Sequence, residues 1–164
     1  MARFTAICQW LSNTVLHLAR IALAALGVVV IYGVVLRYAF SNSPPYIEQV
    51  ALLLVISVAM FGAAAGVHDA GHIGLDSLVR VLPRNVRRWC YVIVEILTVV
   101  FAVTLLVCSV QMGLSTWHDT IPTLGISEAF RYLPILAAGV LITLFSLEHM
   151  LAQFSGHEVV PSWH

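Results

Sequence analysis

The sequence predicts an all-α integral membrane protein with four transmembrane helices and a short amphipathic interfacial helix between the second and third. Two observations predict this fold class. Apolar residues make up 60% of the 164 residues and charged residues only 10%, whereas a soluble domain carries about 25% charged residues. The apolar residues also gather into long runs of about 20 residues, the length that crosses the hydrocarbon core as a helix.

The whole chain, residues 1–164, is predicted to form a single membrane domain. Its four spans are expected at approximately 15–36, 47–67, 89–113 and 129–154. The first span is too long for a secretory signal peptide and no small-residue cleavage site follows it, so it is expected to be a retained helix. Pro44 and Pro45 mark the start of the second span, and Glu48 follows in its first turn, where a carboxylate favours the helix dipole.

An interfacial arm is predicted at approximately 73–82, between the second and third spans. Its apolar residues recur with the helical period, yet the segment is too short to cross a bilayer. Asp76 and Arg80 stand four residues apart on the other side and are able to pair, and Pro83 would end the helix. The residues of the arm are Leu75, Leu78, Val79, Arg80 and Leu82.

The arginines predict the orientation of the chain in the membrane. The sequence has no lysine and a formal net charge of zero, which gives no electrostatic footprint for nucleic acid. Arg37 and Arg131 lie on one side of the predicted membrane, and all other arginines lie on the opposite side. That majority comprises Arg3, Arg20, Arg80, Arg84, Arg87 and Arg88. By the positive-inside rule, both termini are expected in the cytoplasm.

The stretch HDAGHIGLD, residues 68–76, raises the possibility of a metal site. His68 and His72 are four residues apart, and Asp69 and Asp76 are potential further ligands. Two glycines interrupt the stretch, however, and no glutamate lies between the histidines as in a zinc protease motif. The end of the second helix is therefore the favoured interpretation, with His72 and Asp76 organising the turn into the arm. No metal or cofactor is expected.

Three further kinds of site receive weaker support. A haem between facing helices is an alternative, but the candidate histidines lie near span ends; they are His17, His68, His118 and His149. Glu95 is the deepest acid, and an ionisable group within a span is a candidate functional group. A transport path of its own would need a second relay group. No catalytic motif is present in the sequence, so an enzyme is not expected.

The far end of the second span is rich in small residues. Gly62, Ala63 and Gly66 are expected to form a packing face, because small residues let helix backbones approach closely. Together with the basic arm, this face predicts a small membrane protein that holds another membrane protein.

Four segments then support a family resemblance. LRYAFSNSPPYIEQ (36–49), GAAAGVHDAGHIGLD (62–76), LPRNVRR (82–88) and IPTLGI (121–126) occur in this order. Together they resemble the small membrane subunit, the DctQ-like or Q subunit, of tripartite ATP-independent periplasmic (TRAP) transporters, over about residues 20–153. Tyr46 and Gln49 depart from the usual tryptophan and glutamate. The positions that correspond to family motifs are Arg37, Tyr38, Phe40, Tyr46, Glu48, His72, Asp76, Pro83, Arg87 and Arg88.

The resemblance implies a role in the bacterial or archaeal cytoplasmic membrane. A large elevator-type subunit would import an organic acid on a sodium gradient, after a periplasmic binding protein has captured it. The small subunit would be a scaffold that binds the large subunit, contacts lipid and helps dock the binding protein. A haem-binding four-helix redox subunit is the alternative, and a standalone small transporter is the third hypothesis.

Overall fold

The computed structural model describes residues 2–41, 44–70 and 84–155. In this part of the chain no β-strand forms, and the long helices are apolar enough to cross a membrane. This confirms the predicted all-α membrane fold with four spans. The interfacial arm predicted at 73–82 lies outside the described residues. The elements are α1 (Ala2–Ala39), α2 (Pro45–Ala70), α4 (Arg84–Ser115), the 3₁₀ helix η1 (Glu128–Tyr132) and α5 (Leu133–Ser155).

The first and the last helix show the clearest departures from the spans expected from the apolar runs. The first helix begins at Ala2 rather than near residue 15, because the residues before the apolar run also bury one face, with Cys8 only 2% exposed. The fourth span expected at 129–154 starts as η1 and continues as α5. Pro134 is the second residue of α5, where its missing N–H breaks no helical hydrogen bond.

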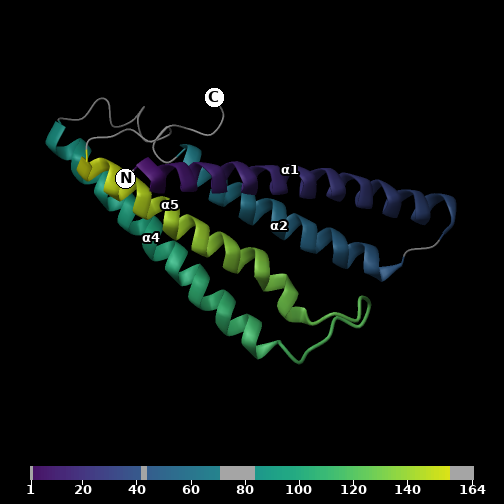
Figure 1. The fold of residues 1–164 in the computed structure, drawn as a ribbon. Helices are drawn as coiled ribbons and strands as arrows, with labels where there is room; N and C mark the ends of the chain where they lie inside the picture. Colours follow the sequence, from purple (N-terminus) through teal and green to yellow (C-terminus); the bar gives the residue numbers. More distant parts are fainter. Residues whose placement is uncertain (1, 42–43, 71–83, 156–164) are drawn as a thin grey trace.

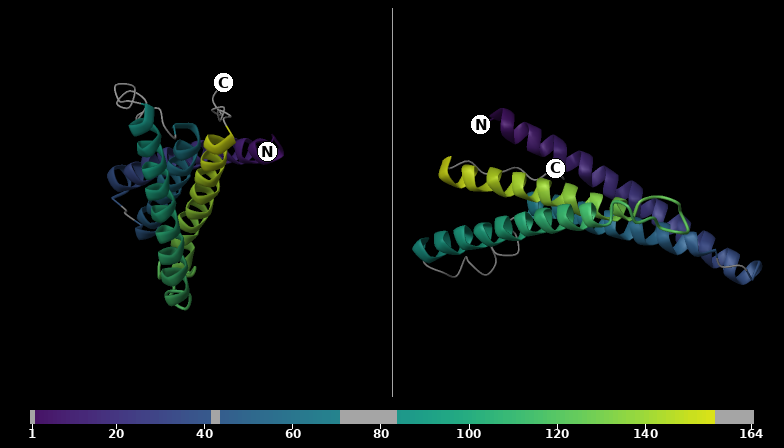
Figure 2. Two further views of the ribbon diagram at one scale, coloured as in Figure 1. Left: turned by 90° about the vertical axis from the view of Figure 1, so that its left-hand side faces the viewer. Right: turned by 90° about the horizontal axis from the view of Figure 1, so that it is seen from below.

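The helices form two hairpins, α1–α2 and α4–α5, with both connecting loops toward one end of the molecule (Figure 1). α2 and α5 make the principal contact between the hairpins. The hairpins cross at an angle, so their loop ends point apart, as the views in Figures 1 and 2 show. The end of α2, the end of α5 and the starts of α1 and α4 lie at the other end, named here the junction end.

The hairpin between α4 and α5 is closed by a structured turn. Ile121 is buried there and its backbone exchanges hydrogen bonds with the turn, the N–H of Ile121 donating to the Ile126 carbonyl at 2.8 Å. Gly125 has a φ of 67°, which glycine adopts without a steric cost. The Ser127 hydroxyl caps η1 by accepting from the Ala129 N–H, and it also donates to the Trp117 carbonyl.

Small residues set the distance between α4 and α5. A Cβ atom at Gly139 would lie 3.2 Å from the Leu106 backbone nitrogen and 3.3 Å from the Ala102 carbonyl oxygen. Ala102 and Ala138 are fully buried at the same contact. Because lipid is as apolar as a leucine side chain, such close packing is a main source of helix association in membranes.

We expect Gly139→Leu to separate α4 from α5, because the added side chain would collide with backbone atoms of α4. Overpacking of this kind costs about 1–3 kcal/mol. The measurement is the midpoint of thermal unfolding of the purified chain in detergent, which should fall. Gly62→Leu is the matched control, since a Cβ at Gly62 meets no atom within 4 Å. Equal effects of the two substitutions would contradict this account of the interface.

Candidate functional site

A group of polar side chains is buried at the junction end, and all four long helices contribute to it. This is unusual for a membrane bundle, because burying a polar group costs free energy unless it finds a partner. We name this group the junction cluster. Its buried members are Cys8 from α1, His68 from α2, Glu95 from α4, and Ser146, Glu148 and His149 from α5. Asp69 of α2 belongs to the cluster through its contact with His68 and is partly exposed.

His68 lies at the centre of the cluster and connects α2 to α5. Its Nδ1 atom is 2.9 Å from the Asp69 carboxylate, and its Nε2 atom is 3.5 Å from Oε2 of Glu148. The ring also packs edge-on against Phe145, with the ring centroids 4.8 Å apart. The Cys8 thiol reaches the same carboxylate of Glu148 from α1. One imidazole and one carboxylate therefore join three helices.

Glu95 has relay neighbours that the sequence analysis did not assign to it. Its Oε1 atom lies 4.0 Å from Nδ1 of His149, and Ser146 is a further neighbour. The two histidine rings of the cluster, His68 and His149, have centroids 6.2 Å apart. The carboxylate that was expected to lack a second titratable group nearby therefore lies close to an imidazole and belongs to a cluster of acids and imidazoles.

Neither of the two metal-centred hypotheses gains support. His72 and Asp76, which were considered as metal ligands and then favoured as organisers of the turn, lie outside the described residues. Among the described residues, no group of three or more histidines, cysteines, aspartates and glutamates is arranged to hold a metal ion. The ring nitrogens of His68 face carboxylates instead, and nothing in the cluster or in the protein's relatives supports the haem alternative.

At the loop end, Arg131 connects the two hairpins. Its guanidinium lies 3.0 Å from the Glu128 carboxylate and donates a hydrogen bond of 3.2 Å to the Gln49 side chain on α2. The Arg131 side chain is about three-quarters buried. Gln49 departs from the usual family residue, yet it supplies the acceptor that this arginine uses.

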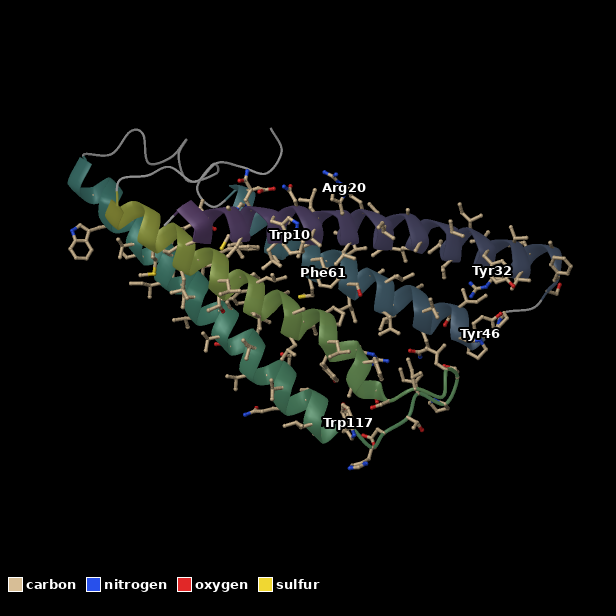
Figure 3. The ribbon with its side chains drawn as sticks, in the orientation of Figure 1. Trp10, Arg20, Tyr32, Tyr46, Phe61 and Trp117 are labelled. Atoms are coloured by element: carbon tan, nitrogen blue, oxygen red, sulfur yellow. The ribbon has the colours of Figure 1, made fainter. Side chains whose placement is uncertain are left out.

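A second pair at the loop end is exposed. Arg37, in the last turn of α1, lies 3.1 Å from Glu48 in the first turn of α2, and their side chains are 57% and 70% exposed. Tyr38 and Phe40 are also exposed, as are Tyr46 and Trp117, which lie near the loop end in Figure 3. The family-motif residues on the first hairpin therefore form a surface rather than a core; they are Arg37, Tyr38, Phe40, Tyr46 and Glu48.

The small residues of α2 divide between two faces. Ala64 and Ala65 are buried within the chain, whereas Gly62, Ala63 and Gly66 are exposed. The predicted packing face is therefore not used between the helices described here. It remains a prediction for contact with another protein.

Several predicted residues lie beyond what the structure describes. Arg87 and Arg88 belong to the first turns of α4, but their side chains are not among those described. His72, Asp76 and Pro83 lie in the segment 71–83, as do the arm residues Leu75, Leu78, Val79, Arg80 and Leu82. Their roles remain predictions.

Arg20 has a position that the sequence analysis did not anticipate. It lies near the middle of the apolar helix segment Thr5–Ala39, with an exposed side chain that points away from the bundle (Figure 3). Gly33 packs against Ile47, and Val15 shares a core cluster with Ala64. This antiparallel register places Arg20 beside the interior of α2 rather than beside its end.

The fold and its polar contacts define a multi-pass membrane protein of two helix hairpins, joined by buried polar groups at both ends. Comparison with known proteins places it more closely. The chain belongs to the DctQ component family of the tripartite ATP-independent periplasmic transporters, whose family model matches residues 26–156. It is therefore a TRAP transporter subunit of the small permease type.

Individual relatives agree with this family. Two Haemophilus influenzae proteins named as TRAP transporter small permease proteins are 24% and 23% identical to the chain over 149 and 137 residues. The first match covers 89% of this chain and 90% of that protein, and the second covers 79% and 81%. The chain is also 29% identical over 135 residues to the sialic acid TRAP transporter permease protein SiaT of H. influenzae. That match covers 79% of this chain but 20% of SiaT.

We expect Arg131→Gln to loosen the loop end, because it removes a largely buried charge that pairs with Glu128 and reaches α2. Arg37→Gln is the matched control, since exposed ion pairs contribute only about 0–1 kcal/mol. The measurement is the distance between spin labels placed on the two loops, which should lengthen or broaden in Arg131→Gln alone. A similar change in both variants would mean that Arg131 is no special connection.

Proposed function

We propose that the chain is the static scaffold subunit of a TRAP transporter in the cytoplasmic membrane. It binds a large elevator-type membrane subunit and helps dock a periplasmic substrate-binding protein. The assembly imports an organic acid on a sodium gradient. The observation that carries the scaffold proposal is the arginine exposed on the outer face of α1.

An arginine within a span is costly wherever it faces lipid. Insertion of a charged residue at the centre of a membrane helix costs about 2.5–3.5 kcal/mol. Within residues 2–41, 44–70 and 84–155, Arg20 has no ion pair or hydrogen bond with another side chain. A second membrane protein with a carboxylate or a free carbonyl at the same depth would remove this cost. Arg20 therefore favours a protein-covered face on α1 over a lipid-covered one.

The residues beside Arg20 suit a closely packed partner helix. Ala24 and Gly27 follow it at the spacing of one helix face and are exposed, and a Cβ at Gly27 would meet no atom within 4 Å. Small residues let a second helix approach the backbone of α1. Ile31 continues the same face and is 66% exposed.

The similarity to SiaT supports the nature of the partner. This chain corresponds to one fifth of that permease protein. A chain that is similar to one part of a longer permease is expected to function beside a protein equivalent to the remainder. A large TRAP membrane subunit fits this requirement.

The loop end is the side that we assign to the binding protein. With Arg20 left out of the count, five arginines lie on the side of the junction end and two on the side of the loop end, so the positive-inside rule assigns the loop end to the periplasm. Arg37, Glu48 and Tyr38 are exposed there, and the pair that Arg37 forms with Glu48 is itself exposed. Their charges remain accessible to a soluble partner.

We expect Arg20→Ala to reduce co-purification of the large membrane subunit after gentle extraction, by about tenfold if a pairing worth 1.4 kcal/mol is lost. Arg20→Lys should retain much of the binding, because it keeps the charge. The chain itself should unfold at an unchanged temperature in each variant. Normal co-purification with Arg20→Ala would exclude Arg20 from the interface.

We expect Glu48→Arg to lower uptake while leaving the membrane complex intact, because it reverses a charge on the docking surface. The measurement is uptake by vesicles that contain both membrane subunits, supplied with the purified binding protein. Uptake should require the sodium gradient and this chain. Full uptake by vesicles that lack this chain would overturn the scaffold role, and uptake by this chain alone would support a standalone transporter.

A further inference from the structure

The junction cluster has more acidic groups than basic ones. The titratable side chains that face one another there come from every long helix: Cys8 of α1, His68 and Asp69 of α2, Glu95 of α4, and Glu148 and His149 of α5. With their carboxylates ionised, Glu95 and Glu148 would place two buried negative charges beside the partly exposed Asp69. Buried charges are expensive within a bundle. Protonation of a buried carboxylate removes its charge.

The geometry shows where one of these protons is needed. Nε2 of His68 and Oε2 of Glu148 lie 3.5 Å apart. Nδ1 of His68 faces the Asp69 carboxylate at 2.9 Å, and Nδ1 is the donor when Asp69 is ionised. In a neutral imidazole Nε2 is then an acceptor, and it faces a carboxylate oxygen that is also an acceptor. Two acceptors oppose each other, and a proton between them would turn one of them into a donor.

A proton is the ligand that fits between His68 and Glu148, because the groups around this pair offer little else to satisfy the two acceptors. His68 and Glu148 are each 2% exposed. Apart from the weakly donating Cys8 thiol, neither oxygen of Glu148 has a hydrogen-bond donor among the described residues, and Nε2 of His68 has no hydrogen-bond partner there. Nor do the described residues offer three ligands to a metal ion.

We propose that the junction cluster is a proton-binding site, in which one proton is shared between Nε2 of His68 and Oε2 of Glu148. Binding forms an O–H bond on Glu148 that faces Nε2 of His68, and the hydronium ion that delivers the proton becomes water. The bound proton completes a hydrogen bond from α2 to α5. Its release leaves two acceptors in contact and weakens the principal contact between the hairpins.

Infrared spectroscopy of the full chain in lipid nanodiscs tests the proposal. At neutral pH the wild-type spectrum should contain the C=O band of a protonated carboxyl group, and this band should disappear as the pH rises. Glu148→Gln should remove or shift the band, whereas Glu48→Gln at the loop end should leave it unchanged. Absence of the band in the wild type, or a band that only Glu95→Gln removes, would overturn the proposal.

The midpoint of thermal unfolding, measured as a function of pH, provides a second test. A pair that only packed α2 against α5, without binding a proton, would not make this midpoint depend on pH. A proton bound only by the folded chain changes the folding equilibrium about tenfold per pH unit, so wild-type stability should fall as the pH rises. Glu148→Gln should flatten this dependence, because the amide donates to His68 without a bound proton. Parallel pH profiles of the two proteins would contradict the proposal.

The wild type alone decides the matter if the variant fails to accumulate. In that case stability must fall with rising pH while the carboxyl band is present, and it must level off where the band is lost. Stability that does not change while the band is present, or that keeps falling after the band is lost, would overturn the proposal. Because both measurements use this chain without its partner subunits, their outcome is independent of the proposed scaffold function.

Discussion

The cost of a charged or polar side chain in hydrocarbon determines where the helices of this protein meet. At the junction end, acids and imidazoles from α2, α4 and α5 lie together with the Cys8 thiol of α1, so each finds polar neighbours that a lipid-facing position would deny it. At the loop end, Arg131 is held by Glu128 and by Gln49 of the other hairpin. The hairpins are apolar on most of their surface, and the polar contacts select one arrangement among the many that apolar packing would allow.

Apolar packing between the helices depends on close approach at glycines and other small residues. Gly139 allows α5 to approach the backbone of α4. Gly33 packs closely against Ile47, because a Cβ atom at Gly33 would lie only 3.0 Å from Cγ2 of Ile47. Neither glycine lies in the small-residue segment that sequence analysis selected. That segment, GAAAG at 62–66, has its alanines 64 and 65 buried and its other residues exposed. A small residue therefore marks a site of close approach only once its orientation on the helix is known.

The number and approximate position of the spans were predictable, because an apolar run of membrane length is rarely anything but a transmembrane helix. The start of α1 was not predictable from hydropathy, since residues 5–14 mix polar and apolar side chains and are helical because one face packs against the bundle. Arg20 was expected at a span end for the same reason. The longer helix and its register beside α2 place it instead at membrane depth.

The junction cluster illustrates a different limit. His68 and His149 were visible as histidines near span ends and Glu95 as an acid within a span, and each was treated separately. Connectivity alone would have placed them together, because the second and fourth spans end, and the third begins, on the same side of the membrane. What connectivity does not supply is rotation about each helix axis, which decides whether the side chains face each other or the lipid.

The two ends of the bundle suit different tasks. At the junction end, buried polar groups bind the hairpins to each other, and little of that chemistry remains for another molecule. At the loop end, Arg131 is largely buried, whereas Arg37 and Glu48 form an exposed ion pair. Solvation of the two separate charges by water offsets most of the free energy gained when they pair. Such a pair contributes little to folding, and its charges suit a surface that meets another protein. A scaffold subunit needs this division between a packed end and a binding end. Because the polar contacts at the junction end fix the hairpins to each other, the loop end can present a charged surface without a change in the fold.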